Sequence, residues 1–173
     1  MANINQQLIE KHIIIIGECQ SNTCLYINNI KWVIDNEINY ELLQRLALSL
    51  HSFSKSFVKE GNQPSFHKLT LSKRSVISRR SKTVEILEDL YSAQIEHYII
   101  VVLTSHSVDD YTMKESLEKE LSIFIQKNKD ILIQLQPKFD EYSKSQIQAN
   151  MSQTKMIEEF LPLFKSYSLS VLI

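Results

Sequence analysis

The sequence predicts a single α/β domain of the α+β type, a sandwich in which helices flank a five-stranded, mainly antiparallel sheet and a helical extension follows. The β-branched run at residues 98–103 is too short to cross a membrane and too apolar for a half-exposed strand, and another β-branched run lies at residues 13–16. Between them, residues 38–57 carry apolar side chains at helical spacing. Together these segments indicate a buried sheet covered by amphipathic helices.

The first two strands form a predicted hairpin. Residues 13–16 and 24–27 are apolar, and the turn formers Gln-Ser-Asn-Thr at 20–23 separate them. Cys19, Cys24 and His12 lie in or beside this hairpin, but a structural zinc site needs four closely spaced ligands. We therefore expect no metal and no disulfide framework here, and interpret both residues as ordinary hairpin cysteines.

An amphipathic helix of roughly five turns follows. Its apolar stripe includes Leu42, Leu46, Leu50 and Phe53, and Gly61 suits its C-terminal end. We expect this stripe to pack against the sheet, with Leu46 and Leu50 nearly fully buried at its centre.

The middle of the sheet is less clearly marked. Residues 66–71 alternate weakly after Pro64 and predict a strand. Residues 83–91 fit a strand through Val84 and Ile86 but also fit a helical stripe. We favour the strand, because the preceding segment then has a hairpin partner.

A basic cluster separates these two segments. Several cations close together can bind lipid phosphates, and they can also bind an acidic protein. No aromatic residues are interleaved for base stacking, and the net charge of the chain is −1, so we expect no nucleic acid partner. The other interpretation is a solvated, exposed hairpin or loop. The candidate anion or lipid contacts are Lys73, Arg74, Arg79, Arg80 and Lys82.

Residues 98–104 predict a central strand buried on both faces, with Ile100 and Val102 on one side and Ile99 and Val101 on the other. Thr112 and Glu115 match a capping box that opens the next helix. Pro137 is expected to end that helix.

The loop after this strand holds the candidate catalytic residues His106, Asp109 and Asp110. A histidine and an aspartate at this place can act as a base and its orienting partner. The simpler interpretation is that the aspartates favour the positive end of the following helix. No serine elbow or partnered catalytic cysteine accompanies the loop.

The C-terminal part is predicted to be helical over residues 139–147 and again near 156–164, with a kink or early end at Pro162. Its apolar residues either pack in the core or dock a partner. The candidate partner-binding residues are Phe160, Leu161 and Phe164, with Leu163 beside them.

This order of two strands, a helix, three strands and a long helix resembles the longin and roadblock families, which share a profilin-like sandwich. The resemblance covers residues 11–135 and includes the helix ending Leu-His-Ser-Phe-Ser-Lys at 50–55 and the strand at 98–104. It implies a domain over 1–136 and an extension over 137–173. It also implies a partner-binding helix face or sheet edge, with Tyr40, Arg45, Ser49 and Ser52 as the candidate face.

The function that this resemblance implies is a non-enzymatic scaffold or regulator working with a small GTPase or a membrane-trafficking complex. A homodimer and a peripheral contact with an anionic membrane are further expectations. The alternatives are a small enzyme that uses the His106, Asp109 and Asp110 loop, or a structural subunit that only dimerises.

Composition limits the other classes. Only two glycines occur, and neither a dinucleotide-binding nor a P-loop motif is present, so we expect no nucleotide cofactor. The N-terminal segment lacks a signal-peptide core, and no apolar run approaches ~20 residues. We expect a cytoplasmic protein.

Overall fold

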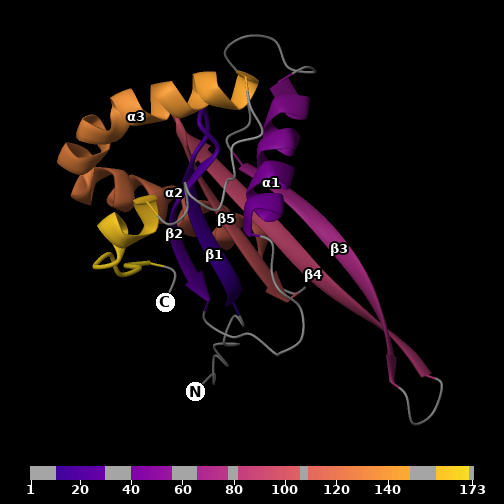
Figure 1. Ribbon diagram of the computed structural model, residues 1–173. Helices are drawn as coiled ribbons and strands as arrows, with labels where there is room; N and C mark the ends of the chain where they lie inside the picture. Colours follow the sequence, from indigo (N-terminus) through magenta and orange to yellow (C-terminus); the bar gives the residue numbers. More distant parts are fainter. Residues whose placement is uncertain are drawn as a thin grey trace, which may run out of the picture.

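In the computed structural model, five antiparallel strands form one open sheet in the order β2-β1-β5-β4-β3 (Figure 1). The structure describes residues 11–29, 40–55, 66–77, 82–105, 109–148 and 159–171. The fold is α+β, as the sequence predicts. The strands are β1 (Lys11–Glu18), β2 (Thr23–Asn29), β3 (Phe66–Ile77), β4 (Lys82–Ile95) and β5 (Tyr98–Ser105).

Helices cover the two faces of the sheet unequally. Helix α1 (Tyr40–Lys55) packs on one face through Ala47. The other face is covered by α2 (Asp110–Lys127) and the short 3-10 helix η1 (Leu161–Phe164) (Figure 1). Helix α3 (Lys129–Gln148) packs on α2 and adds side chains to the same core. The sheet therefore separates two hydrophobic cores, and the larger one includes the C-terminal segment.

The central strand β5 is buried on both faces, as predicted. Ile100 and Val102 belong to the core beneath α2, whereas Ile99 and Val101 belong to the core beneath α1. All four side chains are buried. The β-branched sequence of β5 therefore predicted its central position in the sheet correctly.

The strands β3 and β4 form a long hairpin, so residues 83–91 are strand, as favoured from the sequence. The β4–β5 pairing extends from Glu88 to Ile95, so residues 82–87 of β4 pair with β3 alone. These residues and the end of β3 form a two-stranded arm that projects beyond the rest of the sheet (Figure 1).

The face of α1 that packs on the sheet differs from the predicted one. Leu46 and Leu50 are only partly buried, and Phe53 is 65% exposed. Among the α1 side chains that the structure describes, at residues 44–53, the buried ones are Ala47 and two polar residues, Gln44 and His51. The prediction that Leu46 and Leu50 are nearly fully buried was therefore wrong, although Leu46 does pack against this core. Gln44 and His51 can be buried beside Ala47 because they have hydrogen-bond partners in the sheet.

The predicted start of α2 is also wrong by three residues. Asp109, not Thr112, is the N-cap: its carboxylate accepts hydrogen bonds from the Thr112 backbone N–H at 2.8 Å and hydroxyl at 2.7 Å. An aspartate cap carries a full charge at the positive end of the helix, which favours it over threonine.

Pro137 does not end a helix. The break falls earlier, at Asn128, whose backbone N–H and side-chain amide both donate to the Phe124 carbonyl. Pro137 lies inside α3, between the buried residues Leu135 and Phe139. Packing of these neighbours compensates the hydrogen bond that proline cannot donate. Helix α3 therefore continues across residues 136 and 137.

Candidate functional site

The loop aspartates each have a structural partner. Asp109 caps α2, and its hydrogen bonds to Thr112 lower the pKa of its carboxyl group. Asp110 accepts hydrogen bonds from Lys68 Nζ at 2.8 Å and from the Tyr91 hydroxyl at 3.0 Å. His106, the third candidate catalytic residue, lies outside the described residues.

Lys68 and Asp110 belong to a polar network that joins β3, β4 and α2. The buried Asp89 carboxylate accepts a hydrogen bond from the Thr70 hydroxyl at 2.7 Å and lies 3.6 Å from Lys68 Nζ. The hydrogen bond to Asp110 raises the pKa of the Lys68 amine, and burial raises that of Tyr91 to about 12. Near neutral pH these shifts keep Lys68 charged and Tyr91 protonated. The network is therefore better suited to holding β3, β4 and α2 together than to proton transfer.

A second buried polar pair joins α1 to β4. His51 Nε2 and Ser92 Oγ lie 3.1 Å apart, and the His51 ring meets the His67 ring edge-on with centroids 4.1 Å apart. Ser92 is only 1% exposed, so its hydroxyl cannot reach a substrate. Sequence analysis missed this pair, although His51 falls on the same helix face as Gln44 and Ala47.

The two cysteines lie in and beside the β1–β2 hairpin. Cys24 is buried in β2 and Cys19 is partly buried in the adjoining turn. Among the described residues no group of three or more histidine, cysteine or acidic side chains could hold a metal ion. The His12 side chain lies outside the described part.

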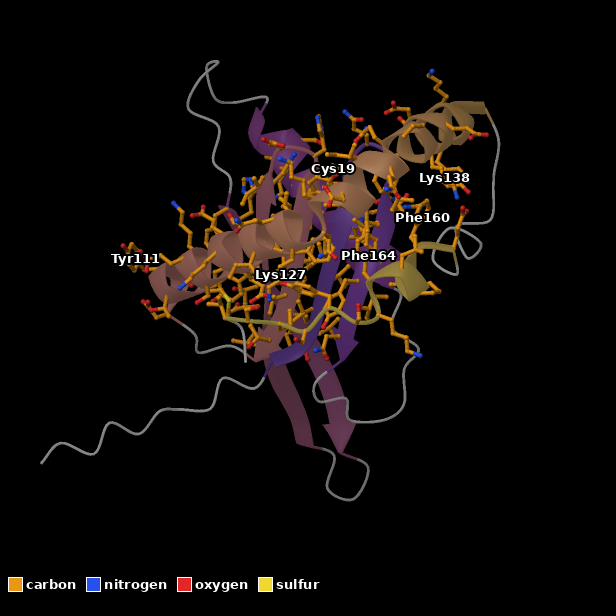
Figure 2. All side chains as sticks on the ribbon, turned by 90° about the vertical axis from the view of Figure 1, so that its left-hand side faces the viewer. Cys19, Tyr111, Lys127, Lys138, Phe160 and Phe164 are labelled. Atoms are coloured by element: carbon orange, nitrogen blue, oxygen red, sulfur yellow. The ribbon has the colours of Figure 1, made fainter. Side chains whose placement is uncertain are left out.

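The C-terminal segment packs in the larger core. Figure 2 shows Phe160 and Phe164 in this segment. Phe160 contacts the Phe139 ring at a centroid distance of 5.4 Å, and Phe164 contacts Phe124 at 5.3 Å. Both phenylalanines are buried, Leu161 is partly buried, and Leu163 is 46% exposed. The structure thus gives Phe160 and Phe164 the core-packing role that was the alternative to partner docking.

A buried glutamate holds the end of this segment. The Glu120 carboxylate accepts hydrogen bonds from the Tyr167 hydroxyl and from the backbone N–H groups of Ser170, at 2.9 and 3.0 Å, and Val171, at 2.6 Å. Burial, then the bond to Glu120, raises the pKa of Tyr167. Sequence analysis missed these hydrogen bonds to Glu120. The one feature of the sequence that points to them is the position of Glu120 on the same helix face as Leu117 and Phe124.

The candidate partner face of α1 borders a cavity of about 620 Å³. The structure brings Arg45, Ser49 and Ser52 together there, whereas the Tyr40 side chain lies outside the described ones. The cavity lies between α1 and the β1–β2 turn. Its lining residues are Asn22, Arg45, Leu48, Ser49, Ser52 and Phe53.

The basic cluster belongs to the projecting arm. Lys73 and Arg74 lie on β3 and Lys82 begins β4, with Arg74 opposite Glu85 in the strand register. Arg79 and Arg80 fall in the segment between these strands, outside the described residues.

No protein-family model matches this chain, and no curated protein or solved structure is significantly similar to it. None of the described helices is both long and apolar enough to cross a membrane. The fold class and the local geometry are therefore the basis for a functional proposal.

Proposed function

We propose that this protein is a non-enzymatic interaction module, a scaffold or regulator that works with a small GTPase or a membrane-trafficking complex. The observation that carries the proposal is the connectivity of the sheet: two strands, α1, three strands and α2, all in one antiparallel sheet. This is the element order on which the resemblance to the longin and roadblock families rests. Because one fold can host several functions, the proposal also needs a binding surface.

The edge strand β3 offers such a surface. It pairs with β4 on one side and with no other strand among those the structure describes. Its 12 residues present backbone N–H and C=O groups that another strand can pair with. This edge supports either a protein partner or a homodimer.

The arm adds charge to this edge. It carries Lys73, Arg74 and Lys82, with Arg79 and Arg80 between its strands. An arm that projects from the sheet can reach a flat anionic surface, so a peripheral membrane contact is part of the proposal.

The contacts of Asp109 and Asp110 favour binding over catalysis. A small enzyme at this site would use His106 as the base and one of these aspartates as its orienting partner. Asp109 instead caps α2 and Asp110 pairs with Lys68. Both aspartates thus have structural roles that hold their carboxyl groups in the ionised form.

The test is the affinity of the full chain for a panel of purified small GTPases, each loaded with GDP or with a GTP analogue. We expect at least one to bind with a dissociation constant of roughly micromolar or tighter, and to distinguish the two nucleotides. If every GTPase in the panel binds with a dissociation constant above about 1 mM, and equally with either nucleotide, the result would argue against a GTPase partner.

The arm is tested with vesicles that contain phosphatidylserine. Replacing Arg79 and Arg80 by glutamate should abolish binding at low salt, and added salt should weaken binding of the wild type. The matched control reverses Lys114 and Lys119, which are exposed on α2. If the control loses binding equally, the effect is one of net charge and not of the arm.

A further inference from the structure

We propose that two copies of this chain pair through the cavity between the β4–β5 turn and the junction of α2 with α3, each copy covering the cavity of the other. The inference deepens the homodimer part of the proposed function and rests on it. Three features of the described residues carry it: an apolar centre that is open to solvent, two opposite charges on facing walls, and a glutamate in an unfavourable backbone conformation.

The cavity has an apolar centre. Its volume is about 600 Å³, and its apolar lining residues are Ile95, Tyr98, Ile125, Leu132 and Ile133. Ile133 leaves 62% of its surface exposed, and Ile95 and Ile125 are only partly buried. Exposed aliphatic side chains that gather in one hollow are typical of an interaction surface, whereas single ones are ordinary. A partner that covers this hollow would bury three isoleucines at once.

The walls of the cavity carry one charge of each sign. Glu96 lies in the β4–β5 turn and Lys129 begins α3, and both side chains are exposed. Among the described residues, neither forms an ion pair with another side chain. The other polar lining residues, Ser122, Gln126 and Gln136, are uncharged and can both donate and accept hydrogen bonds. The lining is thus electrically balanced, which allows this surface to bind its own copy.

Two-fold symmetry turns this balance into complementarity. In a dimer with a two-fold axis, each contact between two different residues occurs twice, once in each direction. An axis through the cavity would therefore set Glu96 of each copy against Lys129 of the other, with two ion pairs at the rim of one apolar patch. A small apolar ligand would cover the isoleucines but leave both charges without a counterion. The charges therefore favour a second copy.

The backbone at Glu96 indicates that its carboxylate has a role. Ile95 pairs with Tyr98, so Glu96 and His97 form a two-residue hairpin turn. Glu96 has a φ of 52°, a conformation that glycine and asparagine adopt readily and glutamate rarely. Residues kept in such conformations cluster at functional sites. An asparagine would suit the turn better, whereas a glutamate supplies the negative charge that faces Lys129 in the dimer.

The edge strand β3 is less suited to a second copy. It contains Lys68, Lys73 and Arg74 and no acidic residue. A copy paired along this edge would bring further cations beside these, and like charges on neighbouring strands are destabilising. Self-association through the cavity leaves β3 available for a different protein.

The test measures the mass of the full chain by sedimentation equilibrium. We expect the wild type to have twice the 20.2 kDa of a single chain, with a dissociation constant of roughly micromolar. Glu96→Lys and Lys129→Glu should each raise this constant at least about tenfold, because each variant places two like-charge pairs in the dimer. Mixed in equal amounts, the two variants should associate as tightly as the wild type, since each copy supplies the charges that the other lacks. Lys119→Glu, on the exposed surface of α2, is the matched control and should have no effect.

Several results would overturn the dimer site. These are a wild type that stays monomeric at about 100 µM, single variants that dimerise as well as the wild type, or a mixture that stays monomeric while circular dichroism shows that both variants are folded. A monomeric wild type in which dodecanoate shifts the NMR signals of the Tyr98 and Ile133 amides would overturn the dimer and assign the cavity to an acyl chain. In each case, binding of a small GTPase by the same chain would leave the proposed function standing.

Discussion

The Glu120 carboxylate in α2 accepts a hydrogen bond of 2.6 Å from the backbone N–H of Val171, which lies 51 residues further along the chain. The same carboxylate binds Ser170 and the Tyr167 hydroxyl, so it fixes both the main chain and a side chain of the C-terminal segment. The Tyr167 ring also meets Tyr26 and Phe124 edge-on. The segment is thus held by a buried charge and by aromatic packing together.

Replacing Glu120 by glutamine should destabilise the protein by about 1–3 kcal/mol, because one of two buried acceptor oxygens becomes a donor that faces other donors. Urea unfolding monitored by circular dichroism measures this loss. Glu115→Gln, an exposed change of the same kind on the same helix, is the control. Equal stability of the two variants would contradict a stabilising role for the hydrogen bonds to Glu120.

Gly17 and Gln44 should be energetically coupled. A Cβ atom at position 17 would lie 2.3 Å from Gln44 Nε2, closer than real contacts allow. This atom is at the end of the flexible Gln44 side chain, which can move away but then gives up its hydrogen bond to the Thr23 carbonyl. Gly17→Ala should therefore cost about 1 kcal/mol, and much of this cost should vanish when Gln44 is also replaced by alanine. A double-mutant cycle of unfolding free energies measures the coupling, and strict additivity would show that the two residues do not meet.

The Lys68–Asp110 pair should stabilise the fold in a pH-dependent way. The bond to Lys68 lowers the pKa of Asp110 below its ordinary value of 3.8. The stabilisation is therefore complete above about pH 4 and is lost as pH falls through the lowered pKa. Because the pair is partly exposed, we expect only a few tenths of a kcal/mol, about 0.5 at most.

Thermal unfolding of the wild type and of Asp110→Asn from pH 2 to pH 7 tests this expectation. The variant should be slightly less stable at pH 7, and the two curves should converge at the acid end. A difference that grows toward low pH would have the opposite sign and would contradict the pairing.

The C-terminal phenylalanines should behave as core residues. Phe160 is fully buried against Phe139, so Phe160→Ala should cost about 3–5 kcal/mol. Leu163 is 46% exposed, so Leu163→Ala should change stability by less than about 1 kcal/mol. Similar small losses for both variants would mean that the segment detaches readily in solution.

Much of the sheet could be predicted from the sequence. The run at 98–103 is apolar on both faces, and a strand at the sheet centre is the arrangement that buries it. The run at 13–16 could be predicted as one strand of a hairpin. Alternation then assigned Ile100 and Ile99 to opposite cores. Hairpin pairing also settled residues 83–91, where the local pattern fitted both strand and helix.

The helices were harder to predict because their decisive contacts are polar and distant in sequence. Gln44 and His51 are buried through partners on β2 and β4, which no helical pattern contains. Leu46 and Leu50 therefore appeared to be the core face. The role of Glu120 could not be predicted for the same reason, since its partners lie near residue 170.

The most direct test of the interaction module is light scattering on the full chain, alone and mixed with each small GTPase of the panel. The account predicts a mass above the 20.2 kDa of a single chain, either twice that value for the protein alone or the sum of both proteins in a mixture. A mass of 20.2 kDa for this protein in every sample, at high concentration, would contradict the account.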